Sequence, residues 1–423
     1  MHCRNVLIFA LFASLPLFTA VPVTAAEGQL HAGTAKVDIT PENPVEPVHD
    51  PVFVRSLILE VDGKRTALIA IDLPGFRSEN LVDTCREKHN IDFLLLCASH
   101  NHSAPRATRD SQLPGGNYQA HYEAKTLEAV EKALENMFPA KISAGNRAFP
   151  QLGFNRLIIR EDGRAKESWF EDHHYRKENP DHIPFGPVDP EVGVVKIVDM
   201  EGKPRAFIVN YAMHSDIMCF NYEITADYPG VTTRIVEETF EGANCLFVNG
   251  AAGNVESLQI SRRRNGPDDP IKGEYHIMER VGQLLAFEAI KLAKQLPAGP
   301  DKTSFVHVAE ILPLTGRRDK NVKMEVVIAT LLINDNIVIG VSPGELFSQL
   351  QLEWKAKMRL ADTIPLFFGY TWLGGVSPGY VPDVRSAALG GYGAEGSRIE
   401  VGAGERIINK LIEHYYMLNG LMR

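Results

Sequence analysis

A strong excess of charge of either sign is missing from this sequence. Its 44 lysines and arginines are nearly balanced by 53 aspartates and glutamates, which leaves a net charge of −9. Basic residues gather only in SRRRNG at 261–266, a stretch that reads as a solvated loop. Proteins that bind nucleic acid usually present a basic surface, so a nucleic-acid partner is not expected.

Cysteine is also scarce, with five among 423 residues. Cys3 lies in the N-terminal apolar segment, which leaves Cys85, Cys97, Cys219 and Cys245 in the rest of the chain. A chain of this length can bury a large apolar core and does not need disulfides for stability. Because Cys97 and Cys245 lie within apolar runs, we expect them to be buried free thiols.

Long apolar runs are missing outside the N-terminus. Residues 1–26 combine an early arginine, an apolar core and small residues before Glu27, a pattern that predicts a secretory signal peptide. We therefore expect an exported protein, periplasmic or secreted, without a transmembrane anchor. Residues 27–423 show no break in composition and are predicted to form one domain.

Several common catalytic motifs are absent, among them H-E-x-x-H, the Walker loop and G-x-G-x-x-G. GVSPG at 340–344 and 375–379 does match the G-x-S-x-G of serine hydrolases, and His414 with Asp362 or Asp383 could complete a triad. However, proline follows both serines, and the oxyanion hole needs a backbone N–H from that residue. The lack of that N–H argues against a serine hydrolase.

The chain does contain alternating strand-like and helix-like segments. This alternation predicts an α/β fold with mixed sheets and flanking helices. Strands are expected at SLILEVDG, TALIAIDL, FLLLCAS, VGVVKIVD, AFIVNYAMH, CLFVNG, VVIATLLIND, NIVIGV and PLFFGYTW, and helices near 78–89, 120–137, 229–241, 274–294 and 344–360.

Side chains that can bind metals follow several of these strands. His100 ends FLLLCAS, His214 ends AFIVNYAM, Glu345 follows NIVIGVSPG and Tyr380 follows PLFFGYTWLGG. In open α/β sheets ligands bind beyond the carboxyl ends of strands, so this recurrence predicts a metal site there. His100 and His102 share one face of an extended segment, which would bring both rings into one cleft.

Each of these residues also has a purely structural interpretation. The histidine pair could form a polar turn, and His214 could be a hydrogen-bonded core histidine. Glu345 is expected in the first turn of a helix, where the dipole favours a carboxylate without any function. Asp227 could cap a helix or orient a metal-bound histidine.

The ordered motifs resemble the catalytic domain of the neutral/alkaline (non-lysosomal) ceramidases. HAGTAKVDITP is similar to that domain's opening, and ASHNHSAP to its T-H-T-H-S-G-P signature. NRL, NYAMHSD, NGAAGN, SPGE and GYVPD resemble later family motifs in the same order, from about residue 31 to about residue 395. The family's additional immunoglobulin-like domain is not expected within these 423 residues.

The resemblance implies a set of site residues and a reaction. Zn²⁺ would be held by His100, His214, Glu345 and Tyr380, with Tyr370 as an alternative to Tyr380. The amide carbonyl would be flanked by His102 and Arg156. The implied function is a zinc amidohydrolase that cleaves an N-acyl amide, ceramide-like or related, with at most transient contact with a membrane surface.

Two alternatives remain open at this point. The same metal chemistry could hydrolyse an ester or another acyl linkage. The family turn G-D-x-S-P-N is also altered here, with Asn254 in place of aspartate and Glu256 in place of serine. That change would suit a catalytically degenerate member that binds a lipid or glycan without turnover.

Overall fold

The computed structural model describes residues 26–44, 46–105, 118–149, 152–167, 186–218, 221–259, 268, 274–360 and 362–422. The predicted signal peptide lies outside them except for its last residue, and so do Cys219 and the basic stretch 261–266. No helix in the described ranges is both long and apolar enough to cross a membrane.

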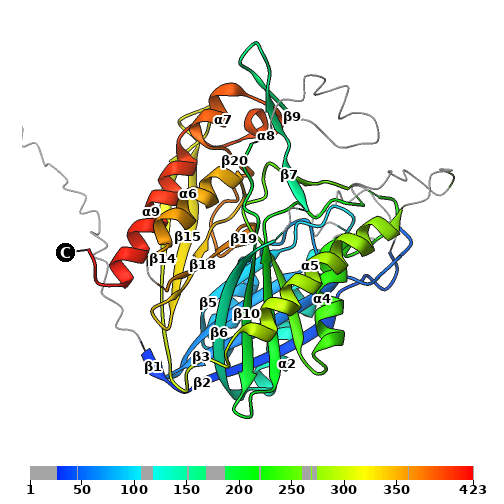
Figure 1. Cartoon of the computed structure of the whole chain (residues 1–423), viewed down its shortest axis with the longest axis vertical. Coiled ribbons are helices and arrows are strands. Elements are labelled where there is room, and N and C mark those ends of the chain that lie inside the picture. Colours follow the sequence, from blue (N-terminus) through cyan, green and yellow to red (C-terminus); the bar gives the residue numbers. More distant parts are fainter. Residues whose placement is uncertain are drawn as a thin grey trace, which may run out of the picture.

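A nine-stranded mixed sheet forms the larger part of the fold (Figure 1). Its strand order is β12-β11-β10-β6-β2-β3-β4-β5-β19. The strands are β2 (Leu30–Asp38), β3 (Phe53–Val61), β4 (Lys64–Ile71), β5 (Ile91–Ala98), β6 (Phe138–Ala148), β10 (Glu191–Asp199), β11 (Pro204–Tyr211), β12 (Asn244–Asn249) and β19 (Thr371–Trp372).

A five-stranded sheet faces the first one, in the order β1-β14-β15-β16-β18. These strands are β1 (Ala26–Gly28), β14 (Thr303–Thr315), β15 (Lys323–Ile333), β16 (Ile337–Val341) and β18 (Ile364–Phe368). Three short pairs complete the strands: β7 (Gly153–Asn155) with β13 (Val255–Ser257), β8 (Leu157–Ile159) with β9 (Ala165–Glu167), and β17 (Glu345–Leu346) with β20 (Tyr380–Val381).

Helices cover the outer faces of both sheets. The described helices are α1 (Glu79–His89), α2 (Gln119–Glu135), α4 (Asp227–Thr239), α5 (Tyr275–Gln295), α6 (Ser348–Met358), α7 (Val384–Leu389), α8 (Tyr392–Gly396) and α9 (Ala403–Leu418). Helices α1, α2, α4 and α5 pack on the nine-stranded sheet, and α6 and α9 pack on the five-stranded sheet. The predicted α/β fold with mixed sheets is confirmed.

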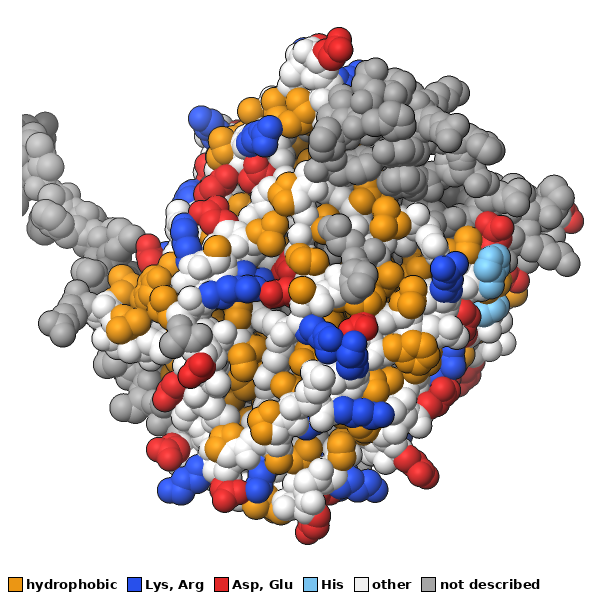
Figure 2. All heavy atoms as spheres, viewed as in Figure 1, with side chains coloured by type: hydrophobic (Ala, Val, Ile, Leu, Met, Phe, Trp, Pro, Cys, Tyr) orange, Lys and Arg blue, Asp and Glu red, His pale blue; other side chains and the backbone are white. Residues whose placement is uncertain are grey.

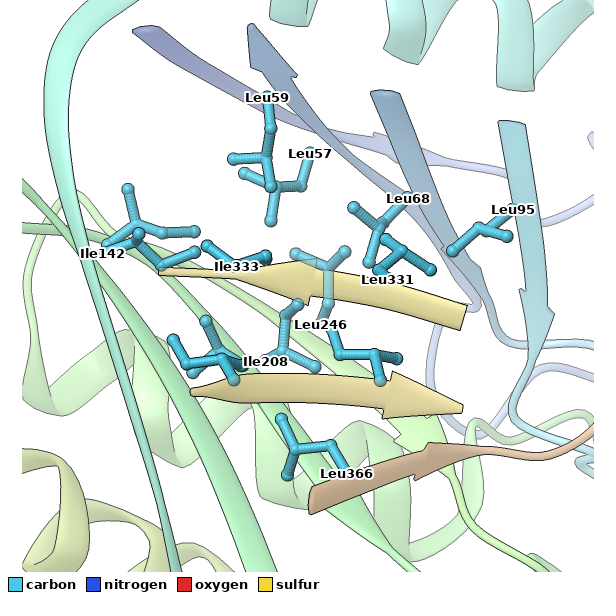
Figure 3. Close-up of a cluster of buried hydrophobic side chains, with 14 of the residues drawn as sticks. Leu57, Leu59, Leu68, Leu95, Ile142, Ile208, Leu246, Leu331, Ile333 and Leu366 are labelled. Carbon is cyan, nitrogen blue, oxygen red and sulfur yellow. The ribbon is translucent and has the colours of Figure 1, made fainter. Parts of the chain in front are cut away.

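Four hydrophobic clusters hold these layers together, and the central one lies between the two sheets (Figure 3). The position of strand β5 between two buried layers explains why its sequence is a continuous apolar run. Phe93, Leu95 and Cys97 face the cluster between the sheets, whereas Leu94 and Leu96 face the helices. Each face of such a strand is buried against a different layer.

Three sequence expectations about elements need comment. Helix α6 begins at Ser348, not near 344, so Glu345 lies in strand β17 and not in a helix's first turn as expected. Among the longer elements, helix α9 and strands β2, β6 and β14 were not anticipated. Cys85, Cys97 and Cys245 are buried free cysteines, which confirms the expectation for Cys97 and Cys245.

Charged side chains on the face shown in Figure 2 are mixed in sign. Lysines and arginines alternate there with aspartates and glutamates over the described part of that face. This distribution agrees with the small net charge of the sequence.

Candidate functional site

The nine-stranded sheet curls so that residues from distant strands meet. Its edge strand β12 contacts β3, β4 and β5, although six strands separate β12 from β5 in the sheet order. Beyond the strand ends, the hydroxyl of Ser215 donates a 2.7 Å hydrogen bond to the carbonyl of Ser99. This closure brings His214, which follows β11, next to His100, which follows β5.

His100, His214 and Glu345 form what we call the metal-type cluster. The Nε2 atom of His100 and the Nε2 atom of His214 each lie 3.4 Å from Oε2 of Glu345. Ligands of a tetrahedral zinc with bonds of about 2.0–2.1 Å lie roughly 3.3–3.4 Å apart. The spacing therefore fits three ligands of a single ion.

Backbone carbonyls set the orientation of both imidazoles. Nδ1 of His100 lies 2.7 Å from the carbonyl oxygen of Pro74, and Nδ1 of His214 lies 3.1 Å from that of Val255. These contacts require Nδ1–H in both rings and direct the Nε2 lone pairs towards Glu345. Histidines that bind metals are commonly oriented in this way.

Two atoms of the metal-type cluster are buried without a hydrogen-bond partner among the described residues. They are Nε2 of His214 and Oε2 of Glu345, whose contact at 3.4 Å does not make a hydrogen bond. Leaving buried polar atoms unsatisfied is costly, and native structures rarely do so without a functional reason. A cation between these atoms would satisfy both, so the residues fit a metal ion.

Electrostatics within the site lower the pKa of two of its side chains, Glu345 and His102. Burial would raise the pKa of Glu345, but the neighbouring imidazoles of His100 and His214 hold it well below its ordinary value. Burial, and then those same two imidazoles, hold the pKa of His102 well below its ordinary value. The carboxylate is therefore charged and the His102 ring is neutral.

His102 lies in the same place as the other two histidines. Its ligand atom and those of His100 and His214 all lie within 4.8 Å of one another, so these three side chains could also hold an ion. His100 has a left-handed backbone (φ 58°), which is uncommon for a side chain other than glycine. Strained backbone conformations of this kind concentrate at functional sites. At His100 the conformation produces a sharp turn directly after β5.

Arg156, Glu256 and Tyr380 form a second group beside the first, which we call the arginine cluster. The buried guanidinium of Arg156 donates hydrogen bonds to the Glu256 carboxylate, to the carbonyl of Gly253 at 2.9 Å and to the hydroxyl of Tyr380 at 3.2 Å. Burial would raise the pKa of Glu256, but Arg156 and then His214 hold it below its ordinary value. The pair is therefore a buried ion pair.

The altered turn connects both clusters. The carbonyl of Val255 contacts Nδ1 of His214, while Gly253 and Glu256 hold the guanidinium of Arg156. Asn254 accepts a 2.9 Å hydrogen bond from the backbone N–H of Ser348, at the start of α6. The turn therefore positions residues from three separate parts of the chain, a role that its sequence did not indicate.

Two tyrosines reach this region. Tyr380 is the ladder partner of Glu345 in the parallel pair of β17 and β20, which places the two residues side by side. The ring of Tyr370 lies 4.4 Å from the ring of His100, and its buried hydroxyl has no partner among the described residues. Either tyrosine is near enough to be considered as a further ligand.

A cavity of about 570 Å³ opens beside the metal-type cluster. Its wall includes His100, Glu345 and Tyr370. The rest of the wall is a mixture of aromatic, small and charged residues, including Phe76, Trp372, Arg77, Glu79 and Arg398. Its size suits a small molecule or part of a lipid.

Two other expectations can be compared with the structure. The carboxylate of Asp227 accepts hydrogen bonds from the backbone N–H groups of Met218 and Tyr228, and no bond from it to a histidine is seen in the described part. Helix α4 has Ala226 at its N-cap and no side-chain cap hydrogen bond, so neither interpretation of Asp227 is confirmed; its carboxylate instead ties Met218 to the start of α4. His414 contacts Glu310 and not Asp362 or Asp383, which removes the serine-hydrolase triad.

The overall structure is similar to solved structures of ceramidases. It matches neutral ceramidase from Pseudomonas aeruginosa with a TM-score of 0.70 and 15% identity, covering 93% of this chain and 75% of that one. It matches a ceramidase complexed with C2 with a TM-score of 0.71 and 14% identity, at the same coverage. The chain thus has the neutral ceramidase fold, which confirms the predicted resemblance at the level of structure.

No family model matches the chain. No curated protein sequence matches it either.

Proposed function

We propose that this protein is an exported zinc-dependent amidohydrolase that cleaves an N-acyl amide, ceramide-like or a related lipid amide. The observation that carries the proposal is the convergence of two imidazole nitrogens on one carboxylate oxygen, with buried atoms that lack any other partner. The neutral ceramidase fold supports an amide as the substrate bond.

We assign His100, His214, Glu345 and Tyr380 as the zinc ligands. Zinc held there would supply Lewis acidity, the property with which metallohydrolases activate water. We prefer Tyr380 to Tyr370 on electrostatic grounds. Burial raises the pKa of both tyrosines, Glu345 raises both further, and Arg156 lowers both. The effect of Arg156 exceeds that of Glu345 at Tyr380, to which it also donates a hydrogen bond, whereas the effect of Glu345 is the larger one at Tyr370.

His102 and Arg156 would stabilise negative charge on the amide carbonyl oxygen. The neutral imidazole of His102 can donate one N–H to that oxygen. Arg156 supplies a fixed positive charge beside Tyr380, and its position is set by Glu256 and Gly253. Groups held in place before the reaction do not have to reorganise during it.

The altered turn supports an active enzyme over a degenerate binding protein. Asn254 and Glu256 differ from the family pattern, yet both make contacts that position the site. Glu256 supplies an acidic partner for Arg156 two residues after the position at which the family has aspartate. The altered turn thus keeps a fixed cation beside the metal-type cluster, as the proposed reaction requires.

A panel of acyl substrates with and without a chelator tests the proposal. The panel includes ceramides of several chain lengths, shorter N-acyl amides and the corresponding esters. We expect turnover of at least one amide, loss of turnover with chelator and recovery with added zinc. Turnover of esters alone would favour the acyl-hydrolase alternative, and absence of turnover with zinc present would favour a binding protein.

Export is part of the same proposal, since residues 1–26 read as a signal peptide. Mass spectrometry of the exported protein would then find Glu27 as the first residue.

A further inference from the structure

Two arginines on the wall of the cavity have no use in the mechanism above. Arg77 precedes helix α1 and Arg398 precedes helix α9, and both belong to the cavity that also touches His100 and Glu345. They are separated by more than 300 residues in the sequence, so only the fold brings them to one cavity.

Neither guanidinium is neutralised within the described ranges. Both side chains are exposed, and neither makes an ion pair or a hydrogen bond to another described residue. Most other arginines around the site are engaged: Arg156 binds Glu256, and Arg317 donates to the carbonyl of Ala387 at 3.2 Å. The two cavity arginines therefore remain available to a ligand.

Their backbones, by contrast, are held firmly. The side chain of Gln119 donates a 2.8 Å hydrogen bond to the carbonyl of Arg77. The backbone N–H of Arg317 donates a 2.9 Å hydrogen bond to the carbonyl of Arg398, and the neighbouring Ile399 bridges to Gly316. Both guanidinium groups are thus carried on fixed points of the cavity wall.

The charge of the cavity favours an anion. Its acidic wall residues are Glu345, whose carboxylate we assign to the metal, and Glu79. The two arginines outnumber the one remaining acid, and the ion would add further positive charge. The two arginines offer an uncharged fatty chain no specific contact, whereas an anionic group can pair with them.

The size of the cavity limits how far the anionic group lies from the scissile bond. The cavity has a volume of about 570 Å³, and its wall includes both arginines as well as His100 and Glu345. A single small ligand in it can therefore contact the arginines and the metal-type cluster together. In an N-acyl lipid the acyl chain carries no charge, so the charged group belongs to the amine portion.

We propose that the substrate is an N-acyl amide whose amine portion carries a carboxylate, as in an N-acyl amino acid, and that Arg77 and Arg398 bind this carboxylate. The planar guanidinium can bind a carboxylate through two parallel hydrogen bonds, which a neutral hydroxyl cannot match. This inference rests on the proposed function and narrows it from neutral ceramide-like amides to acidic ones.

A matched pair of substrates tests the inference with the zinc-loaded enzyme. N-octanoylglycine and N-octanoylethanolamine share the acyl chain and differ in a carboxylate against a hydroxyl. We expect kcat/KM to be at least about tenfold higher for the glycine conjugate, and this ratio to fall about tenfold in Arg77→Gln and in Arg398→Gln. The matched control Arg385→Gln, an exposed arginine outside the cavity wall, should leave the ratio unchanged.

A binding measurement separates failure of this inference from failure of the proposed function. Ketone isosteres, in which CH₂ replaces the amide NH, cannot be hydrolysed and can be titrated calorimetrically into the same proteins. If the acidic isostere binds more tightly than the neutral one and the two arginine variants remove the difference, the inference stands even when no amide is cleaved. Equal binding of the two isosteres, or a preference that survives in Arg77→Gln/Arg398→Gln, overturns it even when amides are cleaved.

Discussion

The metal-type cluster and the arginine cluster lie in one site but differ in how their polar groups are satisfied. In the first, Nε2 of His214 and Oε2 of Glu345 are buried without a hydrogen-bond partner among the described residues. In the second, Oε2 of Glu256 also lacks a hydrogen-bond partner among the described residues, but the carboxylate is paired with the Arg156 guanidinium, which also bonds to Gly253 and Tyr380. A buried carboxylate with no fixed cation beside it indicates a missing positive ligand, whereas one paired with a guanidinium is already neutralised.

The largest expected effect comes from removing a ligand. His214→Ala should lower amide hydrolysis by about three orders of magnitude or more, because metal-dependent activation of the reaction is lost with the ion. His276→Ala, an exposed histidine on α5, is the matched control and should keep full activity. Initial rates for both variants check this, and near-normal activity in His214→Ala would remove the metal-type cluster from catalysis.

The next largest effect distinguishes the role of His102 from the zinc-ligand roles of His100 and His214. His102→Ala should keep its zinc but lose about 10²- to 10³-fold in kcat, because one preorganised donor to the oxyanion is removed. Zinc content and steady-state rates are measured on the same sample. Loss of zinc would instead make His102 a ligand, a role that its distance from His100 and His214 also permits.

Substitution of each tyrosine by phenylalanine tests which of the two binds the zinc. Tyr380→Phe should weaken zinc binding by about 10- to 100-fold, because the phenolate is lost, whereas Tyr370→Phe should leave it nearly unchanged. Competition with a fluorescent chelator gives both affinities. The reverse result would assign the ligand to Tyr370, whose hydroxyl lacks a partner among the described residues.

The smallest expected change in rate comes from the arginine cluster. Glu256→Gln should lower kcat by about tenfold while zinc stays bound, because Arg156 is held less firmly. Removing one partner of a buried ion pair should also lower the free energy of unfolding by about 3 kcal/mol. Urea denaturation measures the second effect.

A double variant provides the control for this pair. Arg156→Gln/Glu256→Gln removes both charges, so much of the stability should return while the activity stays low. If the activity returned as well, Arg156 would have no role in the reaction.

Part of this site could be predicted from the sequence because it depends on local pattern. His100 and His214 each follow an apolar strand, and strands that run through a core end near its edge. The family resemblance then placed Glu345 and Arg156. These residues do lie together in the structure, while their chemical roles remain proposals.

The rest depends on contacts between distant segments. Arg156 and Glu256 are 100 residues apart, and no local pattern indicates that they form a pair. Glu345 was expected in a helix because Pro343 and Gly344 suggested a helix start, but pairing with Tyr380 extends the chain there instead. Helix α9 could have been found, since Ile407, Ile408 and Leu411 have helical spacing.

The zinc content of the purified protein, measured by inductively coupled plasma mass spectrometry, tests the central claim most directly. The account predicts about one zinc per wild-type chain and almost none in His214→Ala prepared in the same way. A wild-type protein without bound metal after incubation with zinc, or a variant with as much zinc as the wild type, would contradict it.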